Sequence, residues 1–224
     1  MTGVQTCALP IYEITLVLVD YKKFTSQAWF DYEVQKMCSI AASMATMKFN
    51  QVFKELSYRE SENLEIICRK NPYLENRDCL TKISNVHTNS AKKGAMFDCR
   101  CFNIPKEEVT NCIYWRQLDA SRNSIQMVGQ ANFSHKELQN KSCNNIQDML
   151  MTQKGINWND LPVYQKRGSC CVRNKIVVKS DGIMETVQLK DTSKSENEWI
   201  VDKNIPIFKG EDRKYIDNLV FVGE

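Results

Sequence analysis

The sequence lacks several features that would identify a common class of enzyme or binding protein. No apolar run approaches the roughly 18 residues that span a membrane, so we expect no membrane partner. There is no P-loop, no G-x-G-x-x-G motif and no arrangement of a nucleophile with a histidine and an acid. The formal net charge is only +3, so overall charge does not point to nucleic acid, although local basic patches could still bind it.

Histidine is scarce, whereas cysteine is not. The two histidines, His87 and His135, lie far apart in the sequence, which argues against a zinc site. The ten cysteines include no C-x-x-C motif, and many of them lie within apolar patterns. No secretory signal is visible. We therefore expect reduced thiols in a cytoplasmic protein rather than a disulfide framework.

The composition, 42% hydrophobic and 25% charged over 224 residues, is that of a globular chain with one large or two small domains. Residues 1–11 form no convincing element and resemble a translated sequencing adapter, so we expect a non-native segment. Glu13–Asp20 is a β-branched run that is apolar on both faces, which predicts a strand in the middle of a covered sheet. A central strand so close to the start indicates a chain that has been cut.

A long helix is predicted next, over 30–56, because its apolar residues recur with a period of about 3.6. Its other face carries Lys36 and Ser39, where small hydroxyls beside a lysine suit the approach of an anion. A plain exposed face is the alternative. Residues 57–93 are polar, and we expect the helix to continue briefly into a loop-rich connection.

The segment 95–104 alternates like a strand, with Asp98 and Arg100 on one face. This pair is either a structural tether or part of a site. A helix over about 106–130 follows Pro105 and has two apolar stripes, so it should pack on both sides. Three polar side chains between the stripes must be paired to be tolerated, either in a structural network or with a substrate. They are Arg116, Asp119 and Asn123.

The C-terminal third reads as shorter elements. Ser134 and Glu137 form a capping box that starts a further helix. Residues 165–169 open a β-hairpin that runs over 170–189, and their Lys-Arg-Gly-Ser sequence could offer two cations and free N–H groups to a phosphate. Basic hairpin starts are common, so this signal is weak alone.

Four separated motifs carry a resemblance to a known family. Their order and spacing resemble the tRNA(His) guanylyltransferase family over about residues 13–190, and the helix pattern Lys36-x-x-Ser39-x-x-x-Ser43 also fits. The motifs are Phe97-Asp98-x-Arg100, Trp115-Arg116-Gln117-x-Asp119-x-x-x-Asn123, Ile156-Asn157-x-Asn159-x-Leu161-Pro162-x-Tyr164 and Lys166-x-Gly168-Ser169. Asp119-Ala120-Ser121-Arg122-Asn123 lacks the histidine of eukaryotic members, so the chain resembles bacterial and archaeal relatives.

The resemblance implies an α+β fold with an incomplete polymerase-palm-like (ferredoxin-like) sheet, helices on one face, and a C-terminal helix and β-hairpin region. The implied domains are a palm remnant over 12–105, a C-terminal family domain over 106–190, and a linker with a terminal helix over 191–224. Members are magnesium-dependent nucleotidyltransferases of the cytoplasm that use GTP and ATP. They add guanylate or repair the 5′ end of tRNA in the 3′-to-5′ direction, typically as homotetramers.

The resemblance also assigns roles to individual residues. It implies triphosphate contacts for a set of polar side chains that lie far apart in the sequence, and motif or support roles for a second set. The first set is Lys36, Ser39, Lys166, Arg167 and Ser169, with the equivalence of Lys166 and Arg167 left open. The second set is Asp98, Arg100, Arg116, Asp119, Asn123, Asn157 and Asn159.

The metal site departs most from the family pattern. Members carry an Asp-Gly-Arg/Lys-x-Phe segment and a Ser-Asp-Glu turn, and only Glu13 of the latter remains, as a remnant of the catalytic motif. Tyr12 stands where a metal-binding aspartate is expected. We therefore expect no metal ligands, an inactive chain and an uncovered edge on the 14–19 strand. The alternative is a non-catalytic tRNA-binding or oligomerisation module.

Overall fold

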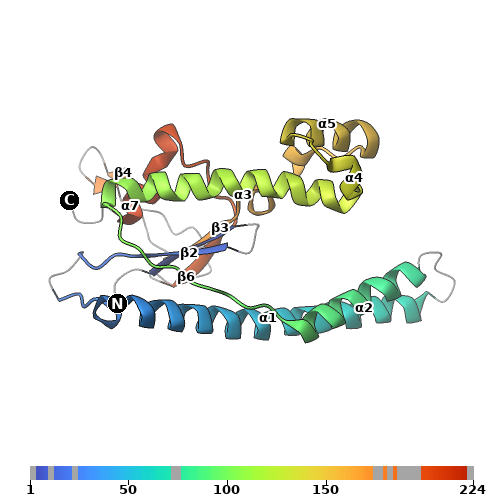
Figure 1. Ribbon diagram of the computed structural model, residues 1–224, viewed down its shortest axis with the longest axis horizontal. Coiled ribbons are helices and arrows are strands. Elements are labelled where there is room, and N and C mark those ends of the chain that lie inside the picture. The colour runs from blue at the N-terminus through green and yellow to red at the C-terminus, as the bar shows by residue number, and fades with distance from the viewer. Residues whose placement is uncertain are drawn as a thin grey trace. The chain divides into compact units, whose positions relative to one another are not determined.

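The computed structural model describes residues 4–9, 13–21, 25–71, 77–173, 179–180, 184–185 and 198–220. The chain forms two compact units (Figure 1). Residues 1–27 and 104–224 make the first, which we call the sheet unit, and residues 28–103 make the second, the helical unit. This division differs from the expected segment boundaries, because the N-terminal strands pair with strands from the C-terminal part. Within those ranges, no helix is long and apolar enough to cross a membrane.

The sheet unit is built on a four-stranded antiparallel sheet in the order β2-β1-β3-β6. The strands are β1 (Val4–Leu9), β2 (Glu13–Leu18), β3 (Ser169–Arg173) and β6 (Trp199–Asp202). The expectation that residues 1–11 form no element is wrong, since β1 occupies an inner position. Its strand character comes from partners on both sides, and one of them lies more than 150 residues away, so local periodicity could not reveal it.

The strand β2 lies at the edge of this sheet and not in its middle, which corrects the prediction of a covered central strand. Ile14, Leu16 and Leu18 are each about two-fifths exposed, while the alternating residues are partly buried. Among the ranges given above, β2 has a partner strand on one side only, so the expected uncovered edge is confirmed. A strand that is apolar on both faces is therefore compatible with an edge position.

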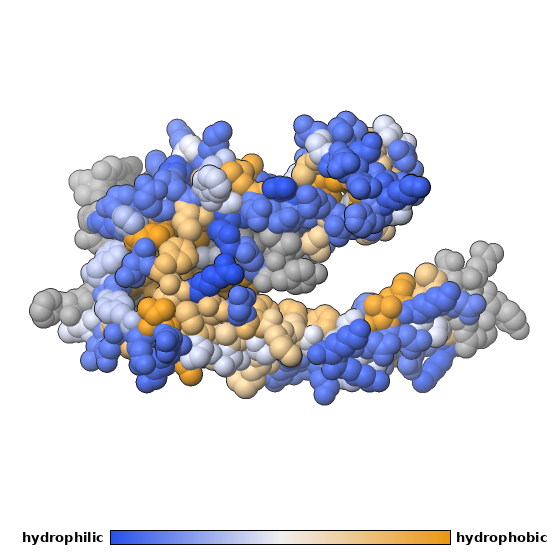
Figure 2. Space-filling view, in the orientation of Figure 1, coloured by the Kyte–Doolittle hydropathy of each residue, from blue (hydrophilic) through white to orange (hydrophobic). Residues whose placement is uncertain are grey.

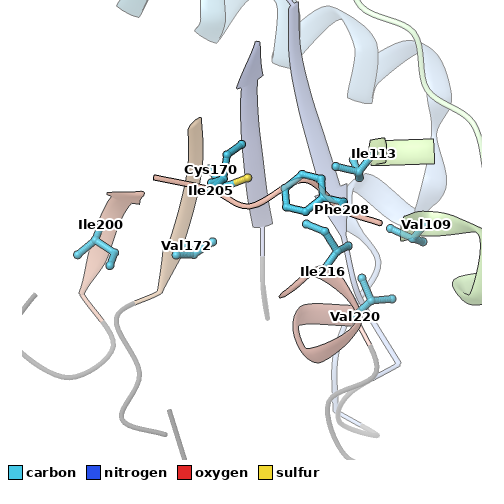
Figure 3. Packing of buried hydrophobic residues seen from close by; sticks show 9 residues of the cluster. All are labelled: Val109, Ile113, Cys170, Val172, Ile200, Ile205, Phe208, Ile216 and Val220. Atoms are coloured by element: carbon cyan, nitrogen blue, oxygen red, sulfur yellow. The ribbon is translucent and has the colours of Figure 1, made fainter. Parts of the chain in front are cut away.

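Two helices cover one face of the sheet, which gives the α+β class expected from the sequence. They are α3 (Val109–Asn132), preceded by the turn η2 (Lys106–Glu108), and α7 (Lys214–Val220), preceded by η4 (Gly210–Arg213). Their apolar side chains meet those of β3 and β6 in one buried cluster (Figure 3). It comprises Val109, Ile113, Cys170, Val172, Ile200, Ile205, Phe208, Ile216 and Val220.

The far half of α3 packs in a second cluster against α4 (His135–Leu138) and α5 (Cys143–Lys154). Its buried members are Ile125, Phe133, Ile146 and Leu150. The two halves of α3 therefore pack in separate clusters, while Leu118 and Met127 stay exposed, so the predicted packing on both sides does not hold along the whole helix. Gly129 lies where α5 approaches, and a Cβ there would stand 2.8 Å from Ile146 Cγ2.

The predicted capping box at the start of α4 is confirmed. The Ser134 hydroxyl accepts from the Glu137 backbone N–H, and the Glu137 carboxylate accepts from the Ser134 backbone N–H at 2.8 Å. Hydrogen bonds from the Ser134 hydroxyl and then from its backbone lower the pKa of Glu137 below its ordinary value. This box fixes the turn between α3 and α5.

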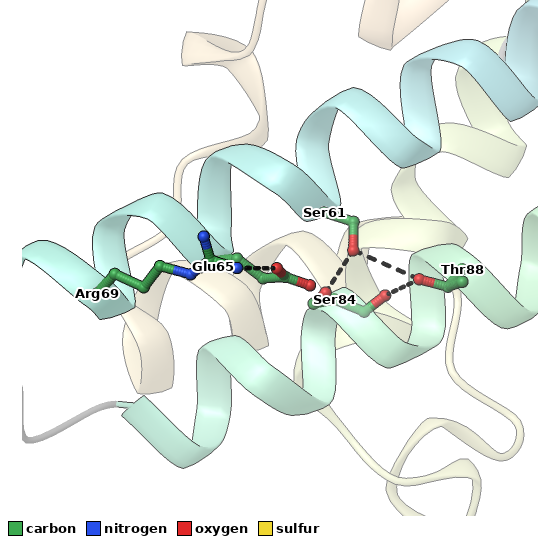
Figure 4. A network of polar contacts seen from close by, with 5 residues as sticks. All are labelled: Ser61, Glu65, Arg69, Ser84 and Thr88. Carbon is green, nitrogen blue, oxygen red and sulfur yellow. Dashed lines mark hydrogen bonds and ion pairs between the residues drawn. The ribbon is translucent and has the colours of Figure 1, made fainter.

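The helical unit is an antiparallel pair formed by α1 (Val34–Lys70) and α2 (Arg77–Lys93), entered through the turn η1 (Trp29–Tyr32). Most of the predicted loop-rich connection over 57–93 is therefore helical. Hydroxyl groups explain the error, because they occupy the interface that apolar residues usually fill. Ser61 hydrogen-bonds to Ser84 and lies 3.4 Å from the Thr88 hydroxyl, which donates to Ser84 O (Figure 4).

Residues 94–103, which we call the strap, run along α1 without pairing to another strand (Figure 1). The predicted strand over 95–104 is therefore wrong. Its backbone groups bond to side chains instead: the Asn50 amide pairs with both Ala95 N and Ala95 O, and Phe97 N donates to Thr46 Oγ1. The predicted alternation does hold, since the odd-numbered residues of 95–101 are partly buried and the even-numbered ones exposed.

The remaining described elements are short and fall between residues 158 and 185. A turn η3 (Trp158–Asp160) leads into the short helix α6 (Val163–Arg167). The strands β4 (Lys179–Ser180) and β5 (Met184–Glu185) pair antiparallel, in agreement with a hairpin in the predicted region. Residues 170–173 of the predicted hairpin belong instead to β3, which pairs with β1 and β6. Its other residues, apart from β4 and β5, and the charged linker at 191–197 lie outside the described ranges.

Candidate functional site

The strand register brings residues from both ends of the chain to one end of the sheet. Glu13 pairs with Leu9 on β1, and the neighbouring Ala8 pairs with Ser169 on β3. Glu13 and Ser169 therefore lie at the same end of the sheet with β1 between them. At about 4.8 Å per strand, their backbones are roughly 10 Å apart.

Glu13 forms an ion pair with Arg116, so β2 is tied to the middle of α3. Both side chains are roughly two-fifths exposed. The second carboxylate oxygen, Oε2, is buried and finds no hydrogen-bond partner within the described parts of the chain. Neither the ion pair nor this free oxygen was predicted from sequence, where Glu13 stood only as a motif remnant.

The basic residues at the end of α6 lie in two different environments. Lys166 Nζ donates to the Asn159 carbonyl at 2.5 Å and lies 5.8 Å from the centre of the Trp158 ring. Arg167 Nε is buried and has no hydrogen-bond partner among the residues whose placement is described. Of these two cations, Arg167 keeps an unused donor and Lys166 supports the turn before it.

A glycine makes the transition from these cations to β3. Gly168 has φ 88° and ψ −167°, a conformation that favours glycine, and its N–H donates to Tyr164 O. Ser169 then begins β3 and pairs with β1. The predicted hairpin opening is therefore a short helix that turns abruptly into an inner strand.

The motif around Asn157 and Asn159 supports this turn. The Asn157 side chain accepts from Asn159 N at 3.1 Å and caps η3. Trp158 Nε1 donates to the Ser124 hydroxyl at 3.0 Å, and Ser124 in turn donates to Gln165 O at 2.6 Å. Ser124 was missed by sequence reasoning, although it lies at i+7 from the motif residue Gln117 on the buried face of α3.

The three polar side chains between the stripes of α3 are paired as expected but not in one network, since Arg116 bonds to Glu13 while Asp119 and Asn123 bond to each other. Asn123 Nδ2 donates to Asp119 Oδ2 at 3.2 Å near the surface of α3. Gln117 is the motif residue that is buried, and it bonds to Pro206 O and Phe208 N. Neighbouring motif positions of α3 therefore make different contacts: Arg116 pairs with β2, Gln117 holds the segment after β6, and Asn123 bonds within the helix.

The other predicted triphosphate residues belong to the helical unit. Lys36 lies on α1 with Nζ 5.2 Å from the centre of the Phe30 ring, and the Ser39 hydroxyl donates to Lys36 O at 3.1 Å. Asp98 and Arg100 project from the strap, both about nine-tenths exposed, with 3.9 Å between Arg100 Nη2 and Asp98 Oδ2. The interpretation of this pair as a sheet support is wrong, because it lies on no strand.

The residues that the structure describes do not fit a two-magnesium site. Magnesium takes an octahedral set of oxygen ligands. Across the ranges that the structure describes, no three His, Cys, Asp or Glu side chains gather closely enough to hold a metal ion. Glu13 offers one free oxygen beside the Arg116 guanidinium, which disfavours a cation there. Tyr12 lies outside the described ranges.

Comparison with solved structures finds close likeness to two complexes of bacterial proteins. A bacterial tRNA(His) guanylyltransferase (Thg1)-like protein in complex with ATP is 36% identical, with a TM-score of 0.66 over 99% of this chain and 73% of that chain. Such a protein in complex with GTP is 31% identical, with a TM-score of 0.59 over 99% of this chain and 71% of that chain.

Sequence comparison adds a viral relative of unassigned role. The uncharacterized protein R259 of Acanthamoeba polyphaga mimivirus is 25% identical over 197 residues. The match covers 83% of this chain, which spans 60% of the length of that relative. No family model matches the chain.

Proposed function

This chain belongs to the family of tRNA(His) guanylyltransferase (Thg1)-like proteins, and from that premise we propose that it binds nucleoside triphosphates and the 5′ end of tRNA. The observation that carries the proposal is the 36% identity over 99% of the chain to a protein in complex with ATP. The reaction class is nucleotidyl transfer, and the finer proposal is guanylate addition or 5′-end repair in the 3′-to-5′ direction.

The proposed anion contact is the turn from α6 to β3. Arg167 Nε is a buried donor without a partner in the described structure, and Gly168 and Ser169 follow it at the end of the sheet. A guanidinium gives charge-assisted hydrogen bonds to phosphate oxygens, which are stronger than neutral ones. Lys36 and Ser39 on α1 remain proposed triphosphate contacts of the helical unit.

We expect the 224-residue chain to bind nucleotide without transferring it. The family chemistry implies magnesium, which would neutralise charge on the reacting phosphates if it were held. Glu13 is paired with Arg116, and the described residues gather no carboxylate set around it. The same observation favours the second candidate, a non-catalytic tRNA-binding module, whose binding would weaken steeply with salt.

Calorimetry with GTP and ATP tests the nucleotide contact. Arg167→Ala should weaken binding about tenfold or more, since it removes a charge-assisted contact. Arg167→Lys should recover part of the affinity. Arg122→Ala, an exposed arginine on α3, is the matched control and should leave binding unchanged. Equal affinity for Arg167→Ala and the unmodified chain would refute the assignment of this turn.

A transfer assay separates the two candidates. The chain is incubated with magnesium, labelled GTP and 5′-phosphorylated tRNA, and we expect no incorporated label. Incorporation would refute the prediction of inactivity. Binding of tRNA without any binding of nucleotide would favour the module over the nucleotidyltransferase.

Assembly into a homotetramer is also a proposal. Trp115 and Leu118 on α3 are 75% and 48% exposed, and large apolar side chains in such positions suit a subunit contact. Light scattering of the chain in solution would give its mass directly.

A further inference from the structure

Three cysteines of the helical unit come together, although they lie on separate segments. Cys38 is on α1, whereas Cys99 and Cys101 are on the strap, and all three are free and partly buried. Cys38 is an electrostatic and hydrogen-bonding neighbour of Cys99, whose Sγ also lies 3.8 Å from Arg100 O, and Cys101 lies within electrostatic range of Cys38. None of these cysteines has a role in the proposed nucleotide site.

The register of the strap on α1 explains why these thiols meet. Ala95 bonds to Asn50 and Phe97 bonds to Thr46. The strap therefore runs antiparallel to α1, and each step of two residues along the strap matches a step of four residues along the helix. Two extended residues cover about 6.6 Å and four helical residues cover about 6.0 Å, so the two repeats match.

Continuing the same register places Cys99 beside Ala42 and Cys101 beside Cys38. Cys38, Ala42, Thr46 and Asn50 recur every four residues on one partly buried stripe of α1. Cys99 thus lies one helical turn from Cys38 along this stripe, and Cys38 is its hydrogen-bonding neighbour. On the face shown in Figure 2, hydrophobic residues gather along the middle of this unit, where the strap lies on α1.

We propose that Cys38 and Cys99 are a redox-sensitive pair that closes into a disulfide on reaction with a small-molecule disulfide, and so pins the strap to α1. One protein thiolate attacks a sulfur of the small disulfide and releases one thiolate. The second protein thiolate attacks the resulting mixed disulfide and releases the other. Two protein thiols are oxidised, one small disulfide is reduced to two thiols, and the two protons end on those thiols.

The local chemistry sets the pace of this exchange. Burial, and then the neighbouring thiols, raise the pKa of Cys99, and burial also raises the pKa of Cys101. A raised thiol pKa means less thiolate at neutral pH, so exchange is slow there and accelerates as pH rises. The pair therefore responds to sustained oxidation and is not a fast catalytic dithiol.

Peptide mapping tests the pair directly. The full chain is incubated with oxidised glutathione, blocked with an alkylating agent and digested with trypsin without reduction. Cleavage after Arg100 separates the two strap cysteines, since Cys99 falls in the peptide 94–100 and Cys101 in the peptide 101–106. Cys38 falls in the peptide 37–48. The expected product joins 37–48 to 94–100, and dithiothreitol should release it.

Two serine variants serve as a matched pair. Cys99→Ser should abolish the cross-link, whereas Cys101→Ser should leave its yield within about twofold. The yield at fixed time should also rise several-fold from pH 7 to pH 9. Urea denaturation of each reduced variant checks that the helical unit is folded, so that unfolding is excluded as the cause of a missing cross-link.

Other results would overturn the proposal. A dominant link between 37–48 and 101–106 would assign the pair to Cys101 instead. Glutathione adducts on Cys38 and Cys99 without a cross-link would show that the two sulfurs cannot reach bonding geometry, and so would an unmodified folded chain at pH 9.

Discussion

Gln117 lies in the middle of α3 and is only 2% exposed. Its Nε2 donates to Pro206 O at 2.8 Å, and its Oε1 accepts from Phe208 N at 3.1 Å. The segment that leaves β6 is thereby held on α3, and Phe208 is placed in the core of the sheet unit. A buried amide satisfied on both ends is tolerated, whereas one that loses its partners is not.

Replacing Gln117 by leucine keeps the volume but leaves Pro206 O and Phe208 N without partners. We expect a loss of about 2 to 4 kcal/mol in the free energy of unfolding, since each stranded backbone group costs roughly 1–3 kcal/mol. Urea denaturation followed by circular dichroism measures it. Asn123→Ala removes a surface hydrogen bond on the same helix and should cost less than about 0.5 kcal/mol. Equal losses would contradict the assignment of Gln117.

At this scale the sequence identified many of the site residues but few of their partners. Arg116 was expected to need pairing, and the ion pair with Glu13 supplies it. That pair joins residues more than 100 positions apart, and no local pattern specifies such a contact. The hydrogen bond between Ser124 and Trp158 was missed for the same reason, because the two residues lie in separate elements and no sequence pattern links them.

At the scale of elements, α3 and the capping box of α4 were predictable, since periodicity and capping are local signals. The helix α2 was not, because its interface with α1 contains Ser84 and Thr88 in place of an apolar stripe. The strap was predicted as a strand from its true alternation. Its hydrogen bonds go to side chains of a helix, and a pattern of period two cannot distinguish these two partners.

Gly129 tests how closely α3 and α5 pack. In an exposed helix, glycine to alanine stabilises by about 1 kcal/mol. Here the new Cβ would stand 2.8 Å from Ile146 Cγ2, so we expect Gly129→Ala to destabilise the chain by about 1–2 kcal/mol in urea denaturation. In the Ile146→Ala background, which removes that methyl group, the same substitution should become stabilising. A loss of equal size in both backgrounds would show that the helices are not in contact at Gly129.

At the scale of the molecule, the sheet unit is assembled from both parts of the chain around β1. Its register links Cys7 to Thr15 on β2 and to Cys170 on β3, so both neighbours depend on the backbone of β1. Sequence patterns locate strands but do not give their order in a sheet. Residues 4–9 form a strand because they lie between β2 and β3, although their own sequence predicted no element. The two halves of the sheet meet only through it in the described topology.

Cys7→Pro should therefore disrupt the sheet, since proline lacks the N–H that an inner strand needs for its ladder of hydrogen bonds and is confined to edge strands and bulges. Cys7→Ala keeps the backbone pairing and is the matched control. Hydrogen exchange by mass spectrometry should show lost protection in β2 and β3 for the proline variant alone. Unchanged protection in that variant would exclude β1 from the sheet.

The glycine at the start of the strap has a consequence for the thiols that lie further along it. Gly94 has φ +67°, and a Cβ on it would stand 2.9 Å from the Asn50 amide oxygen that holds Ala95. The chain reverses there within one residue, which sets the phase of every residue that follows. Because the strap repeats every two residues, one inserted residue before Cys99 would turn its sulfur to solvent and bring the Asp98 carboxylate against α1. The spacing of five residues from Gly94 to Cys99 therefore determines whether a thiol or a carboxylate faces α1.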